Sequence, residues 1–452
     1  MERTGCFRPA LIRFSLAGRA VVASDSCGVA PRRGDGSGTG RGAGSAVGRV
    51  RAVAPVVVIA VVLVGLTGAC SAGPRPAERA AGPTAAQVPG TGTAPAGQPS
   101  PSSSSVPPTA AQPRPALAGG PVPPGFRAWS VTFVSDREAY LLGDAPCRRA
   151  PCTSVVRTLD GGRSWRGVPA PRAPLPADPE FLAPSSPDAV RDIRFATGQD
   201  GYAFGAGLWT THDGARSWRR LTNLGAVVDL ATDGRTVYAV ASDCTAAGRP
   251  CRGTRLLTSP VSTDAFRAVA GLASGDGAGA VSTGGGTTVV TLNGARYVRR
   301  GTGGWTRIAE PCQALGGPVV APASGTTLTA YCTEGAAGSL FLTVRQTTDL
   351  GRHWVTISGR PLQLPDGLVS LTAGSASTLA GASASRDLRG RISVSRDGGR
   401  TWADPPLPHT AAGWRYVGAR SATALVALPE PPAAVLWTSD DAGRTWTPHQ
   451  IR

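Results

Sequence analysis

Cysteine is the most reactive side chain that recurs in this sequence, and the spacing of the cysteines indicates that they form disulfide bonds. The chain contains nine cysteines. Six of them fall in three close pairs, namely Cys147/Cys152, Cys244/Cys251 and Cys312/Cys332. Six thiols allow about 15 pairings, and the repeated local pattern around them favours near neighbours. We predict that each close pair forms a disulfide in an oxidising compartment, with reactive thiols as the alternative.

Other reactive side chains are sparse. There are only four histidines, and His212 and His353 lie inside a repeated motif described below, while His409 and His449 stand apart. Metal sites need several such ligands close together. We therefore expect no metal site, no cofactor and no catalytic constellation.

Residues 52–69 form the single long apolar run of the sequence, with Arg49 and Arg51 before it and Cys70 after it. A positive flank, an apolar centre and small residues before a cleavage point are typical of a signal peptide. The tail Leu66-Thr-Gly-Ala-Cys70 resembles the lipobox of bacterial lipoproteins, which implies that Cys70 carries a lipid. The alternative is that the run stays uncleaved as a transmembrane anchor.

The rest of the N-terminal third carries little sign of a folded domain. Residues 1–48 precede the signal and are polar, so we expect an over-extended start site or a disordered segment. Residues 49–70 are the signal peptide with its lipobox. Residues 71–123 are mostly Ala, Pro, Gly, Ser, Thr and Gln, which cannot bury enough apolar surface to fold. They are predicted to be a flexible linker, about 35–45 Å in root-mean-square length.

The composition of the whole chain limits the class of its folded part, which we expect over residues 124–452. Gly (60) and Pro (40) are too frequent for a helical bundle, while 41% hydrophobic residues is too high for a wholly disordered chain. All 46 basic residues are arginine, and the net charge is +17. A Gly-rich, turn-rich chain of this kind favours an all-β domain.

One motif recurs along this region. It reads Ser/Thr-x-Asp-x-Gly-x-Ser/Thr-Trp and ends at Trp165, Trp218, Trp354, Trp402 and Trp446, with Ala215 replacing Gly in the second copy and His353 replacing the second Ser/Thr in the third. The long gap after Trp218 leaves room for two degenerate copies, closing at Phe266 and Trp305. The seven units are each about 47 residues long, which is typical of a four-stranded propeller blade.

The motif resembles the Asp-box of the sialidase and bacterial-neuraminidase-repeat propellers. In that family the box joins the third and fourth strands of a blade, on the face opposite the ligand, and is structural. The resemblance implies an all-β, seven-bladed β-propeller of four-stranded antiparallel blades over residues 124–452. Blade seven looks complete without an N-terminal strand, so ring closure is expected to depend on side-chain packing.

A second recurring pattern, Phe133 to Tyr140 and Phe195 to Tyr202, predicts the hairpin of the first two strands in blades one and two. Together with the box it is similar to the propellers of the photosystem II assembly-factor family, which implies a non-catalytic assembly role. The alternative is a sialidase-like glycoside hydrolase. That family uses a Tyr nucleophile with a Glu partner and an N-terminal Arg-Ile-Pro signature, which is missing here.

Propeller topology places several arginines on one face, where second-to-third strand loops and blade-to-blade connections emerge. These are Arg127, Arg148, Arg149, Arg191, Arg249, Arg252 and Arg415. Guanidinium groups suit carboxylates and phosphates, so we expect a face that binds an anionic ligand. The alternative is that arginine is simply common in this chain.

These features predict a non-catalytic, monomeric β-propeller, lipid-anchored on the extracytoplasmic face of the cell membrane. Its expected partner is an envelope protein or an anionic cell-wall glycan. Nucleic-acid binding is not expected, because basic and aromatic residues are not interleaved.

Overall fold

The computed structural model describes residues 12–15, 19–22, 119–176, 188–243, 252–277, 279–312, 319–336, 339–357, 359, 361–363, 368–383, 390–407, 413–430 and 434–452. Cys70, Cys244, Arg249, Cys251, the signal segment and residues 71–118 of the linker lie outside these residues. β1 (Ile12–Ser15) and β2 (Arg19–Val22) form an antiparallel hairpin. In the part of the chain that is described, no helix is long and apolar enough to cross a bilayer.

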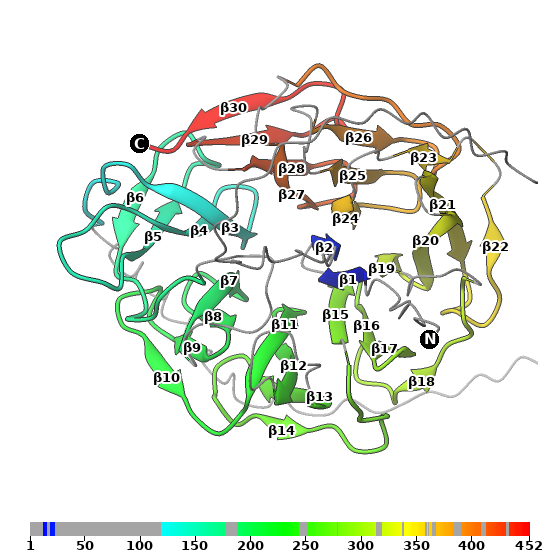
Figure 1. The fold of residues 1–452 in the computed structure, drawn as a ribbon, viewed down its shortest axis with the longest axis horizontal. Coiled ribbons are helices and arrows are strands. Elements are labelled where there is room, and N and C mark those ends of the chain that lie inside the picture. Colours follow the sequence, from blue (N-terminus) through cyan, green and yellow to red (C-terminus); the bar gives the residue numbers. More distant parts are fainter. Residues whose placement is uncertain are drawn as a thin grey trace, which may run out of the picture. The chain divides into compact units, whose positions relative to one another are not determined.

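Residues from Arg127 onward form seven antiparallel blades around a central axis (Figure 1). This confirms the predicted seven-bladed β-propeller. The strands, from innermost to outermost in each blade, are β3 (Arg127–Phe133), β4 (Ala139–Asp144), β5 (Thr153–Thr158) and β6 (Arg166–Val168); β7 (Val190–Phe195), β8 (Gly201–Gly205), β9 (Leu208–Thr211) and β10 (Arg219–Leu221); β11 (Ala226–Thr232), β12 (Thr236–Asp243), β13 (Arg252–Pro260) and β14 (Arg267–Ala268); β15 (Gly279–Gly284), β16 (Thr287–Leu292), β17 (Ala295–Arg300) and β18 (Thr306–Arg307); β19 (Val319–Ser324), β20 (Thr327–Ala336), β21 (Ser339–Thr347) and β22 (Val355–Thr356); β24 (Leu368–Ala373), β25 (Leu379–Ser383) and β26 (Ile392–Ser395); and β27 (Trp414–Ala419), β28 (Leu425–Pro429), β29 (Val435–Ser439) and β30 (Thr447–Gln450).

Two blades depart from the simple pattern. Blade five carries an additional strand, β23 (Leu362–Gln363), which pairs with β21. In blade six the fourth strand is reduced to one bridge between Val394 and Ala403. Pro405 and Pro406 follow almost at once, and proline has no N–H to donate to a longer ladder.

Each repeat motif is a turn between the third and fourth strands, and its polar side chains bind its own backbone. In the first copy, Thr158 Oγ1 accepts from the Gly162 amide at 2.9 Å, and Asp160 Oδ1 accepts from the Ser164 amide at 2.9 Å. The Ser164 hydroxyl donates to Asp160 Oδ2 at 2.6 Å. Burial raises the pKa of Asp160, but these hydrogen bonds outweigh it and lower the pKa to about 2. Gly162 has φ 98°, which glycine adopts without steric cost.

The two degenerate copies also lie where spacing placed them. Phe266 directly precedes β14, and Trp305 directly precedes β18. Neither copy keeps the full motif, so both are identified by their spacing from the complete copies.

Neighbouring inner strands are joined by side chains. Ser130 Oγ accepts from the Ile193 amide at 3.3 Å, and Thr132 Oγ1 accepts from the Phe195 amide at 3.2 Å. The same arrangement joins blades six and seven through Ser370 to Val417 (3.0 Å) and Thr372 to Ala419 (3.1 Å). Hydroxyl groups at alternate positions of one inner strand therefore accept hydrogen bonds from backbone amides at the edge of the next inner strand.

Aromatic rings fill the blade interfaces. Tyr140 of blade one stacks on Phe195 of blade two with ring centroids 3.6 Å apart, and Trp218 meets Phe195 edge-on at 6.1 Å. A Cβ on Gly201 would lie 2.4 Å from the Phe195 ring, so glycine lets that ring lie flat against β8.

Blades seven and one close the ring without sharing a strand, as predicted. β27 to β30 form one sheet and β3 to β6 another. The interface between them is a buried cluster that includes Phe126, Val131, Leu428 and Ile451. Two arginines add to it. Arg415 lies 4.6 Å from the centre of the Trp129 ring, and Arg420 lies 5.0 Å from that of Phe133.

Candidate functional site

The ring has two faces, which we name by their connections. The loop face carries the loops from second to third strands and the links between blades. The turn face carries the turns from first to second strands and the repeat turns. The described arginines of the predicted set all lie at the loop face. Arg127 is the first residue of its inner strand, and Arg191 and Arg415 are the second residues of theirs. Arg148 and Arg149 lie between β4 and β5, and Arg252 begins β13.

Three of these arginines are paired with carboxylates. Arg127 forms an exposed ion pair with Asp144, which also accepts from the Trp129 indole at 2.9 Å. Arg191 is buried and its Nε donates to Asp192 at 3.0 Å. Arg415, with only 5% of its side chain exposed, donates from Nε to Glu430 at 2.8 Å. Their charges are therefore largely balanced within the protein.

The other three described arginines are exposed. Arg148 and Arg149 lie in a short loop closed by the predicted Cys147–Cys152 disulfide, whose Cα atoms are 5.5 Å apart. The loop is also joined at its base, where the Ala145 amide donates to the Cys152 carbonyl at 3.2 Å. Arg252 is exposed on blade three. Arg148 and Arg149 thus form a constrained, positively charged element.

The second described disulfide has a different setting. Cys312 and Cys332 are bonded, as predicted, with Cα atoms 5.5 Å apart. Both are buried, and Cys332 lies within β20. This bridge therefore anchors the connection between blades four and five to a strand.

A sialidase-like mechanism would need a tyrosine nucleophile, but Tyr140 and Tyr202 make structural contacts. The Tyr140 hydroxyl donates to Glu138 Oε1 at 3.0 Å, and Arg157 donates to the same oxygen at 2.6 Å. Tyr140 is fully buried. Burial, helped by the charge of Glu138, raises the pKa of Tyr140. A nucleophile needs the opposite shift. Tyr202 is also buried, and its hydroxyl donates to the Val261 carbonyl at 2.7 Å.

The histidines of the repeat turns are likewise bound locally. His212 Nδ1 lies 2.8 Å from Asp200 and Nε2 lies 3.3 Å from Asp264. His353 lies 2.6 Å from Asp349 of its own turn. Over the described residues, no group of three His, Cys, Asp or Glu side chains could hold a metal ion.

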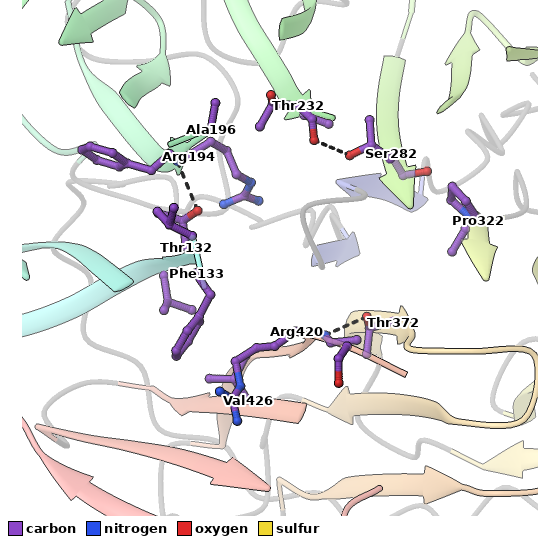
Figure 2. A pocket seen from close by; sticks show the side chains of 18 of the residues that line it. Thr132, Phe133, Arg194, Ala196, Thr232, Ser282, Pro322, Thr372, Arg420 and Val426 are labelled. Carbon is purple, nitrogen blue, oxygen red and sulfur yellow. Dashed lines mark hydrogen bonds between the residues drawn. The ribbon is translucent and has the colours of Figure 1, made fainter. Parts of the chain in front are cut away.

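A cavity that sequence reasoning missed lies in the channel, toward the turn face. Its volume is about 620 Å³, and its walls are the C-terminal ends of all seven inner strands (Figure 2). The lining is mixed. Apolar residues such as Val131 and Leu371 alternate with hydroxyl residues such as Thr132 and Thr372, and two arginines, Arg194 and Arg420, contribute positive charge.

The two arginines of the cavity differ in their surroundings. Arg420 lies along the wall beside Phe133 and pairs with Asp440 at 2.6 Å and with Asp136 at 3.7 Å. The guanidinium of Arg194 points toward the centre of the ring (Figure 2). Arg194 Nη1 donates to the Ile193 carbonyl at 2.7 Å, and its guanidinium lies 5.9 Å from the centre of the Phe204 ring.

A buried carboxylate lies behind this wall. Asp229 of β11 is completely buried and accepts from the Val281 amide at 2.8 Å and from the Leu230 amide at 2.9 Å. Burial raises the pKa of Asp229 to about 6, while the Val281 amide and the charge of Arg194 act in the opposite direction.

Comparisons with known proteins give structural likenesses alone. No family model matches this chain, and no curated protein matches it. It is similar to a structure of YCF48 bound to D1 peptide, with 13% identity, a TM-score of 0.43 and coverage of 74% of this chain and 95% of that one. It is similar to YCF48 from Cyanidioschyzon merolae, with 13% identity, a TM-score of 0.43 and coverage of 74% and 98%. A polysaccharide lyase of a new family, an ulvan lyase of PL25, has 11% identity, a TM-score of 0.43 and coverage of 74% and 94%.

Proposed function

We propose that this chain is a non-catalytic binding propeller, held at the extracytoplasmic face of a membrane by a lipid on Cys70. Its loop face binds an envelope protein or an anionic cell-wall glycan. The repeat motif resembles the Asp-box, and that resemblance implies that the repeat turns are structural and that the opposite face carries the ligand.

The exposed arginine pair in the disulfide-closed loop carries this proposal. Arg148 and Arg149 are adjacent and exposed, and the Cys147–Cys152 bond restricts the loop that presents them. A guanidinium group binds carboxylate or phosphate oxygens through charge-assisted hydrogen bonds. A constrained loop loses less conformational entropy on binding than a free one, so more of the contact energy appears as affinity.

The buried tyrosines support binding rather than glycoside hydrolysis. Tyr140 contacts Glu138, and its hydrogen bonds to Glu138 and to the Gly198 carbonyl, with its stacking on Phe195, serve the blade interface. Its raised pKa leaves it protonated at neutral pH.

A capture experiment tests the proposal. The chain from residue 71 onward, immobilised through its N-terminus, is incubated with isolated cell-wall sacculi and, separately, with detergent-solubilised envelope proteins. We expect specific retention of one of these, weakened by salt, since exposed charge contacts are screened at high ionic strength. Retention of neither material at low salt would contradict a binding role.

A further inference from the structure

The two described disulfides differ in their access to solvent. Cys312 and Cys332 are 5% and 0% exposed, whereas Cys147 is exposed and Cys152 is half-buried. A disulfide is reduced when a thiolate attacks one of its sulfur atoms, so the rate of reduction depends on access to that sulfur. A buried bond must wait for the fold to open locally. A thiol reductant should therefore reach the Cys147–Cys152 bond while the Cys312–Cys332 bond stays intact.

Positive charge beside the exposed bond favours the same reaction. Arg148 directly follows Cys147 in the chain, and Arg149 comes next. Among the described residues, neither of these guanidinium groups has a hydrogen-bonding or ion-pair partner. Cations close to a cysteine stabilise the thiolate form of sulfur. Both arginines therefore favour the approach of an attacking thiolate and the release of the leaving one.

We propose that the Cys147–Cys152 bond is a redox switch of the arginine loop. A protein dithiol outside the cytoplasm reduces the bond, and reduction weakens the binding of the anionic partner by Arg148 and Arg149. The effect on binding rests on the loop-face function proposed above, whereas the selective reduction of this bond can be measured without any partner.

The exchange moves two electrons and two protons from the dithiol to the loop. One thiolate of the dithiol attacks Cys147 Sγ, the sulfur–sulfur bond breaks, and Cys152 leaves as a thiolate that takes up a proton. A mixed disulfide now joins Cys147 to the reductant. The second thiolate of the reductant attacks the reductant's own sulfur in this bond, and Cys147 leaves and is protonated. The loop then holds two thiols, and the reductant holds one disulfide.

Reduction should loosen the loop because its geometry depends on the bridge. At the base of the loop the Ala145 amide donates to the Cys152 carbonyl at 3.2 Å. Farther along, Cys147 Sγ lies 3.2 Å from the Arg149 carbonyl oxygen, so the Arg149 backbone packs against a sulfur that the disulfide holds in place. Without the bond the loop loses more conformational entropy when it binds a partner, and its affinity falls.

The coupling acts in both directions. If reduction weakens partner binding by a given factor, partner binding makes the bond harder to reduce by the same factor. A partner that contacts Arg148 and Arg149 also covers the neighbouring Cys147 and shields its sulfur from attack. The oxidised loop is therefore the binding form, and a bound partner preserves it.

Differential alkylation of the purified full chain tests the chemistry. Free thiols are blocked first, the chain is treated with reduced thioredoxin under native conditions, and the new thiols are labelled and located by mass spectrometry. We expect Cys147 and Cys152 to be labelled at least about tenfold faster than Cys312 and Cys332. Equal rates for the two bonds, or no reduction of either, would overturn the proposal.

Capture on cell-wall sacculi and on solubilised envelope proteins then tests the effect on binding. The full chain is compared in its oxidised form and in its reduced form, the latter after its thiols have been blocked and thioredoxin removed. We expect the reduced form to bind about three- to tenfold more weakly. Cys147→Ser with Cys152→Ser, which leaves the other cysteines unchanged, should bind like the reduced form and should not respond to thioredoxin.

The outcomes of this comparison separate the two proposals. If the oxidised and reduced forms were captured equally well, the switch would be overturned and loop-face binding would stand. If reduction weakened capture but the double serine variant bound like the oxidised chain, the effect would belong to another disulfide and the switch would again be overturned. Capture of neither form would contradict the loop-face function, and the switch with it.

Discussion

Replacing Phe195 by alanine should lower the free energy of unfolding by about 3–5 kcal/mol. Phe195 is 3% exposed, stacks on Tyr140 and meets the edge of Trp218. Truncation removes the contact that fills the interface between blades one and two and leaves a cavity. Urea unfolding followed by tryptophan fluorescence measures the change.

A matched variant separates packing from aromatic stacking. Phe195→Leu keeps most of the volume and should cost less than Phe195→Ala, with the remaining loss reporting the stacking on Tyr140. A loss below about 1 kcal/mol for Phe195→Ala would contradict the assigned interface.

Replacing Arg415 by alanine should lower the free energy of unfolding by about 2–4 kcal/mol. The change leaves Glu430, which is 25% exposed, without its cation and removes the guanidinium from the Trp129 ring. Both contacts belong to blades seven and one, where no shared strand holds the ring. The measurement is again urea unfolding, compared at one pH.

A double variant identifies the cause of that loss. Arg415→Met with Glu430→Gln removes both charges while keeping volume, and it should recover a large part of the stability. If Arg415→Ala left stability unchanged but reduced capture of the partner, Arg415 would belong to the ligand surface instead of the ring closure.

The sequence was informative about the fold because each blade repeats the same local chemistry. Asp160 and its equivalents accept hydrogen bonds from backbone amides of their own turn. The motif can therefore be recognised in the sequence without knowledge of tertiary contacts. Even Phe266 and Trp305, which lack the motif, could be placed by spacing. The reduction of the fourth strand of blade six to a bridge at Ala403, and the additional strand β23, could not be placed in this way. Neither belongs to the repeated motif, and β23 is defined by its pairing with β21.

The candidate sites were less predictable, since they depend on contacts between distant residues. Arg415 was assigned to the ligand face by topology, but Glu430 lies beside it only because β27 pairs with β28. Arg194 gave no local signal, because its cavity is built from seven strands spread along the chain. The alternation of polar residues at Ser130 and Thr132 was visible, yet its role became clear only from the bonds to blade two.

The central claim, that the arginine loop of the loop face binds an anionic partner, is tested most directly by charge reversal. Arg148→Glu with Arg149→Glu is compared in the capture experiment with Arg300→Glu and Arg307→Glu, which place the same charge change on exposed residues of β17 and β18. We predict that the loop variant loses at least about tenfold in affinity, while the β17/β18 variant binds like the unmodified chain. Equal binding by both variants would contradict the claim.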